Sequence, residues 1–204
     1  RTAAPTLFLC ACTLVALAAT NDVRTLNTPR VFPPVASLAE WHTRARDIRE
    51  QALASCGLWP MPEKTPLHAR VFDRLERDDY TVEKVAFQSA PGFYVGGNLY
   101  RPRGQGDGPF PGVLNPHGHW SNGRMADGPD GSVAARCIHF ARQGFVAFSY
   151  DMVGYHDTSF ANHPREGDPG AEFYKRHRLF ATNAICQLWN IHLMGLQTLN
   201  SLRA

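Results

Sequence analysis

The segment from Val113 to Tyr150 constrains the fold more than any other part of the sequence. It starts with a short apolar stretch at 112–115 and ends with a nearly continuous apolar run from Phe145 to Tyr150. We expect both to be buried strands, since strands of a parallel sheet covered on both faces have this composition. Between them Ser132 can cap a helix whose inner face carries Val133, Cys137, Phe140 and Ala141. Two strands joined through a helix over this length predict a right-handed parallel crossover.

A hairpin is predicted before this crossover. Residues 80–88 read as one strand, residues 89–92 as a turn, and residues 93–100 as a second strand. In the second strand the side chains that share the apolar face are Phe93, Val95 and Leu99. The predicted sheet is therefore mixed, with an antiparallel hairpin followed by parallel strands.

Helices are predicted at both ends of this sheet region. Ser37 and Glu40 form a capping box, and the helix that follows is expected to end near Ser55. A continuous apolar helix is expected over 186–204. The fold class is therefore α/β with flanking helices.

The N-terminus has the pattern of a targeting segment. Leu7 to Ala19 is apolar, follows Arg1, and ends near the small residues Ala16 and Ala18. This is typical of a secretory signal peptide, so we expect residues 1–19 to be one and the protein to be secreted or periplasmic. Residues 20–57 then form an extended arm and a helix. A lipid anchor at Cys12 and a buried helix of the mature fold are the weaker alternatives.

Composition supports a globular domain and excludes several classes of function. The 204 residues are 44% hydrophobic and 19% charged, which is enough to build one core and too apolar for a disordered chain. The formal charge of +3 is too small to indicate nucleic-acid binding. After the N-terminus no apolar run is long enough to span a membrane. Cys56, Cys137 and Cys186 cannot all pair with one another, and their spacing fits no metal-binding framework.

The chemistry is predicted at the turn that follows the first strand of the crossover. Its sequence, from Asn115 to Trp120, is Asn-Pro-His-Gly-His-Trp. A His-Gly turn at a strand end can direct backbone N–H groups at the mouth of a sheet, which acyl transfer needs to stabilise a developing oxyanion. Asp151 to Asp157 leaves the next strand at the same end, where open α/β sheets bind ligands.

Here the sequence resembles the α/β-hydrolases, and in particular secreted bacterial acetylxylan-esterase-like hydrolases. The resemblance covers Leu58 to Ala204, and its motifs lie at 59–66, 91–95, 116–120, 151–155 and 195–198. It implies a hydrolase domain over 58–204, without a cofactor or metal. It also implies that the backbone N–H groups of Gly118 and His119 form half of an oxyanion hole. It further implies that His117 and Trp120 shape the substrate pocket. Asp151 and Tyr155 are the other candidates for substrate binding, and the alternative for Tyr155 is to pack under its own loop.

One feature of that family is absent from the sequence. There is no G-x-S-x-G nucleophile motif, and the nearest string, from Gly118 to Gly123, has the wrong spacing. The final helix is similar to the one that precedes the nucleophile strand in the family. We therefore expect an N-terminal fragment that stops roughly 20 residues before the nucleophile, with the catalytic triad beyond Ala204. In the family's sheet order the strands would run 81–88, 93–100, 145–150, 112–115, which leaves 112–115 at the edge.

The predicted function is a carboxylic-ester hydrolase acting on a small ester or an acylated polysaccharide, with this fragment inactive alone. A secreted, non-catalytic carbohydrate-binding module with a Trp120 and Tyr155 rim is the alternative from another class, and a serine peptidase of the same fold is a third.

A zinc site at His117 and His119 is less supported, because Asp-His does not follow. Asp151 is either a pocket residue or a hydrogen-bond acceptor for the turn. The other expectations are a buried location for Trp41, Trp59 and Trp189, and solvated loop positions for His156, Asp157, His163, Asp168 and His177.

Overall fold

The computed structural model describes residues 25, 27–29, 32–120, 122–158, 180 and 182–204. It divides into two units, residues 1–41 and residues 42–204. The predicted signal peptide and the predicted loop positions His163, Asp168 and His177 lie outside the described residues. Among the helices that are described, none has the length and apolar character needed to cross a membrane.

Helix α1 runs from Leu38 to Ser55, as the capping box predicted. The Ser37 hydroxyl accepts a hydrogen bond from the Glu40 N–H (3.1 Å), and the Glu40 carboxylate accepts one from the N–H of Ala36 (2.8 Å). The reciprocal bond thus reaches one residue further back than in the usual motif. The helix has no buried residue. The expectation that Trp41, Trp59 and Trp189 are core residues is wrong, because each is at least half exposed.

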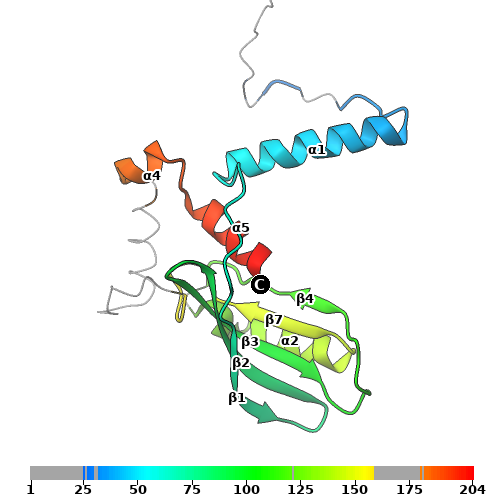
Figure 1. Cartoon of the computed structure of the whole chain (residues 1–204). Coiled ribbons are helices and arrows are strands. Elements are labelled where there is room, and N and C mark those ends of the chain that lie inside the picture. Colours follow the sequence, from blue (N-terminus) through cyan, green and yellow to red (C-terminus); the bar gives the residue numbers. More distant parts are fainter. Residues whose placement is uncertain (1–24, 26, 30–31, 121, 159–179, 181) are drawn as a thin grey trace, which may run out of the picture. The chain divides into compact units, whose positions relative to one another are not determined.

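The central sheet has the strand order β1-β2-β3-β7-β4 (Figure 1). Its strands are β1 (Arg70–Glu76), β2 (Tyr80–Ala90), β3 (Phe93–Pro102), β7 (Val146–Tyr150) and β4 (Gly112–Leu114). Neighbouring pairs from β1 to β7 are antiparallel, and β4 pairs with β7 in parallel. This confirms the predicted mixed sheet and the predicted order of its four strands.

Strand β1 is an addition that the sequence did not predict. All seven of its residues are exposed, so it lacks the apolar alternation that identifies a strand. Its register against β2 shifts between Phe72 and Leu75, where Asp73 has a φ of 52°. Charged residues and a bulge are typical of an edge strand protected against further pairing.

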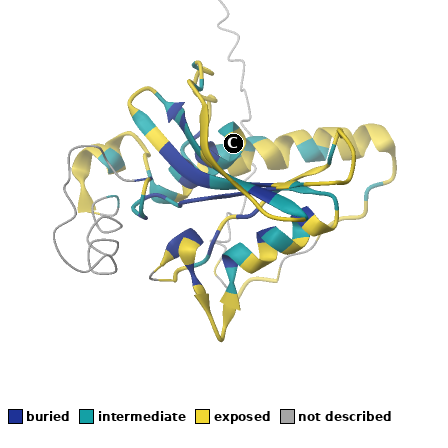
Figure 2. Cartoon of the chain, turned by 90° about the horizontal axis from the view of Figure 1, so that it is seen from below, coloured by how far each residue is buried: buried dark blue, intermediate teal, exposed yellow. Residues whose placement is uncertain are grey.

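Helix α2 (Val133–Arg142) covers one face of the sheet (Figure 2). Ser132 caps it as predicted, since its hydroxyl accepts the Ala135 N–H at 3.0 Å. A short hairpin, β5 (Asp127–Gly128) and β6 (Gly131–Ser132), leads into the helix. The buried residues between α2 and the sheet are Tyr100, Cys137, Ala141 and Ala147.

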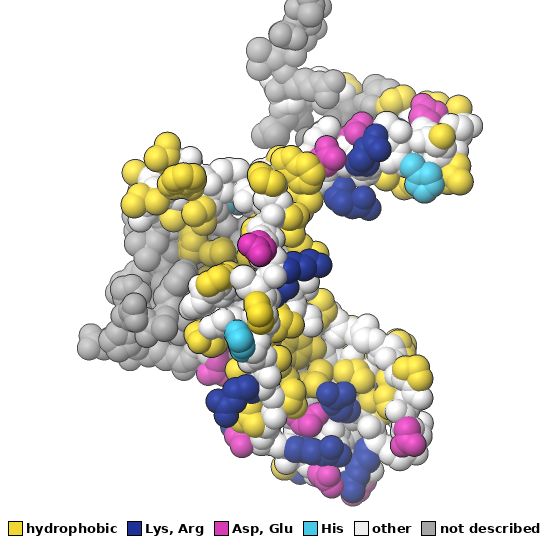
Figure 3. All heavy atoms as spheres, in the orientation of Figure 1, with side chains coloured by type: hydrophobic (Ala, Val, Ile, Leu, Met, Phe, Trp, Pro, Cys, Tyr) yellow, Lys and Arg dark blue, Asp and Glu magenta, His cyan; other side chains and the backbone are white. Residues whose placement is uncertain are grey.

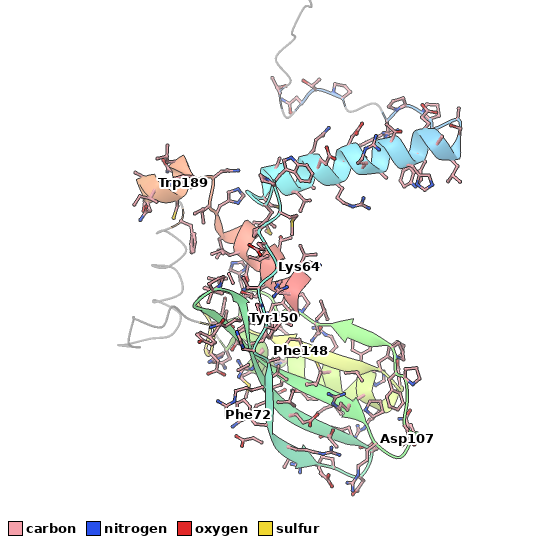
Figure 4. The ribbon with its side chains drawn as sticks, in the orientation of Figure 1. Lys64, Phe72, Asp107, Phe148, Tyr150 and Trp189 are labelled. Atoms are coloured by element: carbon pink, nitrogen blue, oxygen red, sulfur yellow. The ribbon has the colours of Figure 1, made fainter. Side chains whose placement is uncertain are left out.

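The opposite face carries Phe87, Val95, Phe148 and Tyr150, of which the last two lie along β7 (Figure 4). Helix α5 (Leu193–Arg203) reaches this face, where Ser201 forms a hydrogen bond of 2.5 Å with the Tyr150 hydroxyl.

The predicted continuous C-terminal helix is wrong. A separate helix α4 (Ala184–Leu188) precedes α5, and the chain between them passes through Asn190 at a φ of 52°. A residue in this left-handed conformation interrupts a right-handed helix, and Asn tolerates that conformation better than most residues.

Strand β4 lies at the edge of the described sheet. The prediction that it is buried is wrong. Leu114 lies opposite Phe148 in the register, so it shares the face that carries α5, and its exposed fraction is 45%. An apolar hollow of about 420 Å³ adjoins it, lined by residues of the five strands and by Leu67, Ala69, Arg203 and Ala204. Further apolar side chains gather over α4 (Figure 3). The exposure of β4 follows from its having one strand neighbour among the described residues.

Candidate active site

The candidate site lies where β4 and β7 end together. Because the two strands are parallel, the turn after Leu114 and the loop after Tyr150 leave the same edge of the sheet. The ladder continues for one bond past β4, with the Asn115 N–H donating to the Phe148 carbonyl at 2.8 Å. The Asn115 amide also donates to Cys137 Sγ at 3.1 Å and accepts from Arg136 at 3.2 Å. These bonds fix the base of the turn against helix α2.

His117 joins the turn to the loop after β7. Its Nε2 accepts the Met152 backbone N–H at 3.1 Å, so the ring proton is on Nδ1, which donates to the Gly118 carbonyl at 2.7 Å. The ring is buried, and this burial is the main cause that lowers the His117 pKa to about 4. At neutral pH the ring is therefore uncharged, and each of its nitrogens forms a hydrogen bond. We call this hydrogen-bonded ring of His117, which holds the turn to the loop after β7, the strut.

The hydrogen bond from His117 also orients the next peptide unit. The Gly118 carbonyl faces the His117 ring. In a trans peptide the C=O and the following N–H point in opposite directions, so the His119 N–H is directed away from that ring. The Trp120 indole lies beside Gly118, since a Cβ there would be 3.5 Å from it. The turn therefore directs the His119 N–H away from the buried His117 ring, next in sequence to the partly exposed Trp120.

Tyr155 and Gly123 pack around the strut. The Tyr155 ring meets the His117 ring edge-on, with centroids 4.5 Å apart and planes at 79°. Gly123 begins the short 3-10 helix η1 (Gly123–Met125) with a φ of 47°. A Cβ at Gly123 would lie 2.9 Å from Tyr155 and 3.1 Å from His117 Nε2, so only glycine fits without displacement.

An ion cluster of Arg124, Asp151 and Asp157 lies beside the His117 ring, with Arg124 and Asp151 buried and the Asp157 side chain exposed. One amino group of Arg124 contacts the Asp151 carboxylate, and the other lies 2.5 Å from Asp157 Oδ2. Asp151 is fully buried, and it also accepts the Asp157 N–H at 3.1 Å. We call these three residues the Arg124 cluster. Sequence reasoning did not single out Arg124, because one arginine in a polar loop carries no local signal.

The loop after β7 is also attached to β3. The Asp151 N–H donates to the Gly96 carbonyl at 2.9 Å, and the Gly96 N–H donates to the buried hydroxyl of Thr158 at 3.1 Å. A Cβ at Gly96 would collide with Asp157. The turn and the loop are therefore held to the sheet as well as to each other.

The structure brings the six predicted site residues together but gives them different surroundings. His117, Asp151 and Tyr155 are buried and engaged with their neighbours, whereas Trp120 is 38% exposed. Trp120 borders a hollow of about 150 Å³ that is also lined by Asn122, Asp127, Asp130 and other residues of the β5–β6 hairpin. Of the predicted loop residues, Asp157 belongs to the Arg124 cluster, and His156 bonds the Asn122 carbonyl at 2.8 Å.

Metal binding has no support among the described residues. No group of three or more His, Cys, Asp or Glu side chains in that part of the chain could hold a metal ion. The zinc alternative would also need His117, whose two nitrogens already form hydrogen bonds. Cys56, Cys137 and Cys186 are free thiols, and burial raises the pKa of Cys137.

Comparison with known proteins identifies the fold. No family model matches the sequence, and a search of curated proteins finds no significant match. A proposed acetyl xylan esterase from Bacteroides fragilis superposes with a TM-score of 0.59 at 15% sequence identity, over 91% of this chain and 51% of that one. The chain has an α/β-hydrolase fold.

Two further structures superpose with lower TM-scores. One is a methylesterase, with 28% identity and a TM-score of 0.47 over 61% of this chain and 27% of that one. The other is an acetyl xylan esterase from Thermoanaerobacterium, with 12% identity and a TM-score of 0.48 over 76% of this chain and 43% of that one. The chain spans about half or less of the length of these three structures.

Proposed function

We propose that this chain is the N-terminal part of a secreted serine carboxylic-ester hydrolase. Its substrate would be a small ester or an acylated polysaccharide. The observation that carries the proposal is the turn from His117 to Trp120, which leaves the carboxyl end of β4 with its Gly118–His119 peptide oriented by the neutral His117 strut. The α/β-hydrolase fold, and the similarity to a structure described as an acetyl xylan esterase, support the same proposal.

In the proposed mechanism a serine hydroxyl, giving its proton to a base, attacks the ester carbonyl and forms a tetrahedral intermediate. This collapses to an acyl-enzyme as the C–O bond to the alcohol breaks and the alcohol leaves with that proton, and water then hydrolyses the acyl-enzyme to the carboxylic acid and free serine. The backbone N–H groups of Gly118 and His119 stabilise the oxyanion in both steps. Removing one such donor in a hydrolase costs about a hundredfold or more in kcat. Since His117 is uncharged and buried, its part is to hold the peptide and not to transfer a proton.

The sequence contains no G-x-S-x-G motif, so the nucleophile, acid and base of this proposal lie in sequence that follows Ala204. The 204-residue chain should then lack esterase activity.

The experiment compares residues 20–204 with the longer product of the same open reading frame, using p-nitrophenyl acetate as the substrate. We expect turnover by the longer protein only, and loss of that turnover after treatment with a serine-directed organophosphate. Turnover by residues 20–204 that the organophosphate abolishes would contradict the assignment of the nucleophile. A longer reading frame without a serine nucleophile would contradict the esterase proposal.

A second candidate function, carbohydrate binding without catalysis, is favoured by the surroundings of Trp120. An exposed indole beside Asn122, Asp127 and Asp130 offers a stacking face and hydrogen-bonding groups, which is how proteins bind sugars. Titration of the longer protein with xylo-oligosaccharides, followed by tryptophan fluorescence, tests it. Binding that Trp120→Ala abolishes, in a protein with no ester turnover, would favour this candidate over the esterase.

A further inference from the structure

The guanidinium of Arg124 is nearly buried and faces two carboxylates. It contacts Asp151 through Nη1, and its Nη2 lies 2.5 Å from Asp157 Oδ2. The other oxygen of Asp151, Oδ1, lies 4.0 Å from His117 Nε2. One fully buried carboxylate therefore faces a permanent cation on one side and, on the other, a ring that becomes a cation when protonated.

The two protonation states of His117 are not equivalent for the turn. In the neutral state Nε2 accepts the Met152 N–H while Nδ1–H donates to the Gly118 carbonyl. Protonation places a hydrogen on Nε2, which can then no longer accept from Met152 and has Asp151 Oδ1 as the nearby acceptor. The imidazolium would break the bond that ties the turn to the loop after β7.

Charged and titratable groups face His117 from every element that packs against it. Arg124 comes from η1, Asp151, Tyr155 and His156 come from the loop after β7, and His119 comes from its own turn. Besides burial, the positive charges of His156, Arg124 and His119 act to lower the pKa of His117, and the bond to Gly118 opposes them. Arg124 is charged at every working pH.

We propose that Arg124 is a positioning residue of the esterase, which neutralises Asp151 and so keeps His117 in the uncharged form that orients the Gly118–His119 peptide. The inference rests on the proposed function, because the orientation of this peptide matters to chemistry only if it binds an oxyanion. Without the guanidinium, Asp151 is a buried carboxylate whose nearest potential countercharge is His117. The ring then takes up a proton, and the turn loses its bond to Met152.

The first experiment needs no activity. The pKa of His117 is measured by NMR titration in dilute 204-residue chain for Arg124→Met, Arg124→Lys and the double variant Arg124→Met/Asp151→Asn. We expect His117 to remain uncharged down to about pH 5 in the parent chain and in Arg124→Lys, and to titrate at least one unit higher in Arg124→Met. The double variant should return to the parent behaviour, because it removes the unpaired carboxylate. Arg142→Met is the matched control, since it breaks an exposed Arg142–Asp79 pair (2.7 Å) remote from the turn.

Two results would overturn the proposal. One is a folded Arg124→Met chain whose His117 titrates as in the parent. The other is an Arg124→Lys chain whose His117 pKa rises although the positive charge is retained. The Lys variant keeps the test decisive even where Arg124→Met does not fold.

The second experiment measures ester turnover by the longer protein. Arg124→Met should lower kcat about tenfold or more at pH 7 with little change in KM, and the double variant should recover most of the loss. Equal losses in the single and double variants would mean that Arg124 acts only through packing, and would refute the positioning role. If the parent protein shows no turnover while the His117 titrations behave as expected, the esterase proposal fails and the charge coupling stands.

Discussion

At the residue scale, the buried imidazole of His117 makes the stability of the domain depend on pH. Its pKa is lowered from 6.5 to about 4, so the unfolded chain binds the proton more readily than the folded one. The stabilisation is therefore complete above pH 6.5 and is lost as the pH falls toward 4. Between pH 7 and pH 5 we expect this one group to remove about 2 kcal/mol from the free energy of unfolding.

Urea unfolding of the parent chain and of His117→Gln at the two pH values measures this contribution. Glutamine is uncharged throughout and can still accept the Met152 N–H. The variant should therefore lose about 2 kcal/mol less between pH 7 and pH 5 than the parent does, while its other titrating groups are unchanged. Identical pH dependence in the two proteins would mean that His117 is not held neutral by its surroundings.

Gly123 offers a second residue-scale test. Gly123→Ala places a methyl group 2.9 Å from Tyr155 and 3.1 Å from His117, at a φ of 47° that alanine adopts poorly. We expect a loss of about 1–3 kcal/mol of unfolding free energy. Gly128→Ala, where a Cβ would meet no atom within 4 Å, is the control and should change stability far less. Equal effects of the two substitutions would exclude close packing around the strut.

The candidate site shows which residue roles can be predicted from sequence. His117, Gly118 and His119 are consecutive, so a strand followed by His-Gly marks them locally. Arg124 is found only through Asp151 and Asp157, which lie 27 and 33 positions further along the chain. Ion pairs of this kind depend on tertiary contacts that no periodicity records. The position of Asp151 beside the turn could be predicted, because it directly follows a strand parallel to the one before the turn. Its burial against Arg124 could not, because that depends on a tertiary contact.

At the scale of elements, helix α2 depends on one capping bond at the end nearest the site. Ser132→Ala removes the hydroxyl that accepts the Ala135 N–H at 3.0 Å and leaves that donor without its partner. We expect a loss of about 1 kcal/mol in unfolding free energy. Ser132→Asp, which can cap in the same way, should retain most of the stability. If alanine and aspartate behave alike in thermal unfolding, the cap contributes nothing measurable.

Elements with strong local patterns were the ones predicted correctly. The β2–β3 hairpin, the cap of α2 and the apolar run of β7 each follow from period-two alternation, a capping residue or continuous burial. Strand β1 was missed because an exposed, charged edge strand has no apolar period. The interruption between α4 and α5 was missed because the apolar pattern continues through Trp189 and Ile191, although Asn190 reverses the backbone there. Strand β4 was predicted correctly as a strand, but the prediction that it is buried was wrong. Burial of a strand depends on the elements packed beside it, and β4 has one neighbouring strand among the described residues.

At the scale of the whole molecule, the sheet has two edges of different character. The β1 edge carries charged residues, among them Asp73, which pairs with Lys84 of its neighbour β2 (2.8 Å), next to the exposed apolar side chains of Val71, Phe72 and Leu75. The β4 edge carries Leu114 and adjoins the apolar hollow of about 420 Å³. An apolar edge strand is a template for pairing with another chain, whereas a charged edge resists it. The described residues therefore present one edge suited to self-association.

We expect residues 20–204 to self-associate at concentrations on the order of tens of micromolar, through β4 and the hollow beside it. Leu114→Lys should weaken this association by placing a charge at the pairing edge. Leu75→Lys on β1 is the matched control, because Leu75 is 48% exposed and Leu114 is 45% exposed, and the first edge is already charged. Sedimentation velocity and amide exchange of residues 112–115 provide the measurements. A parent chain that stays monomeric, with these amides strongly protected, would show that β4 is covered on both sides in solution and would contradict the association.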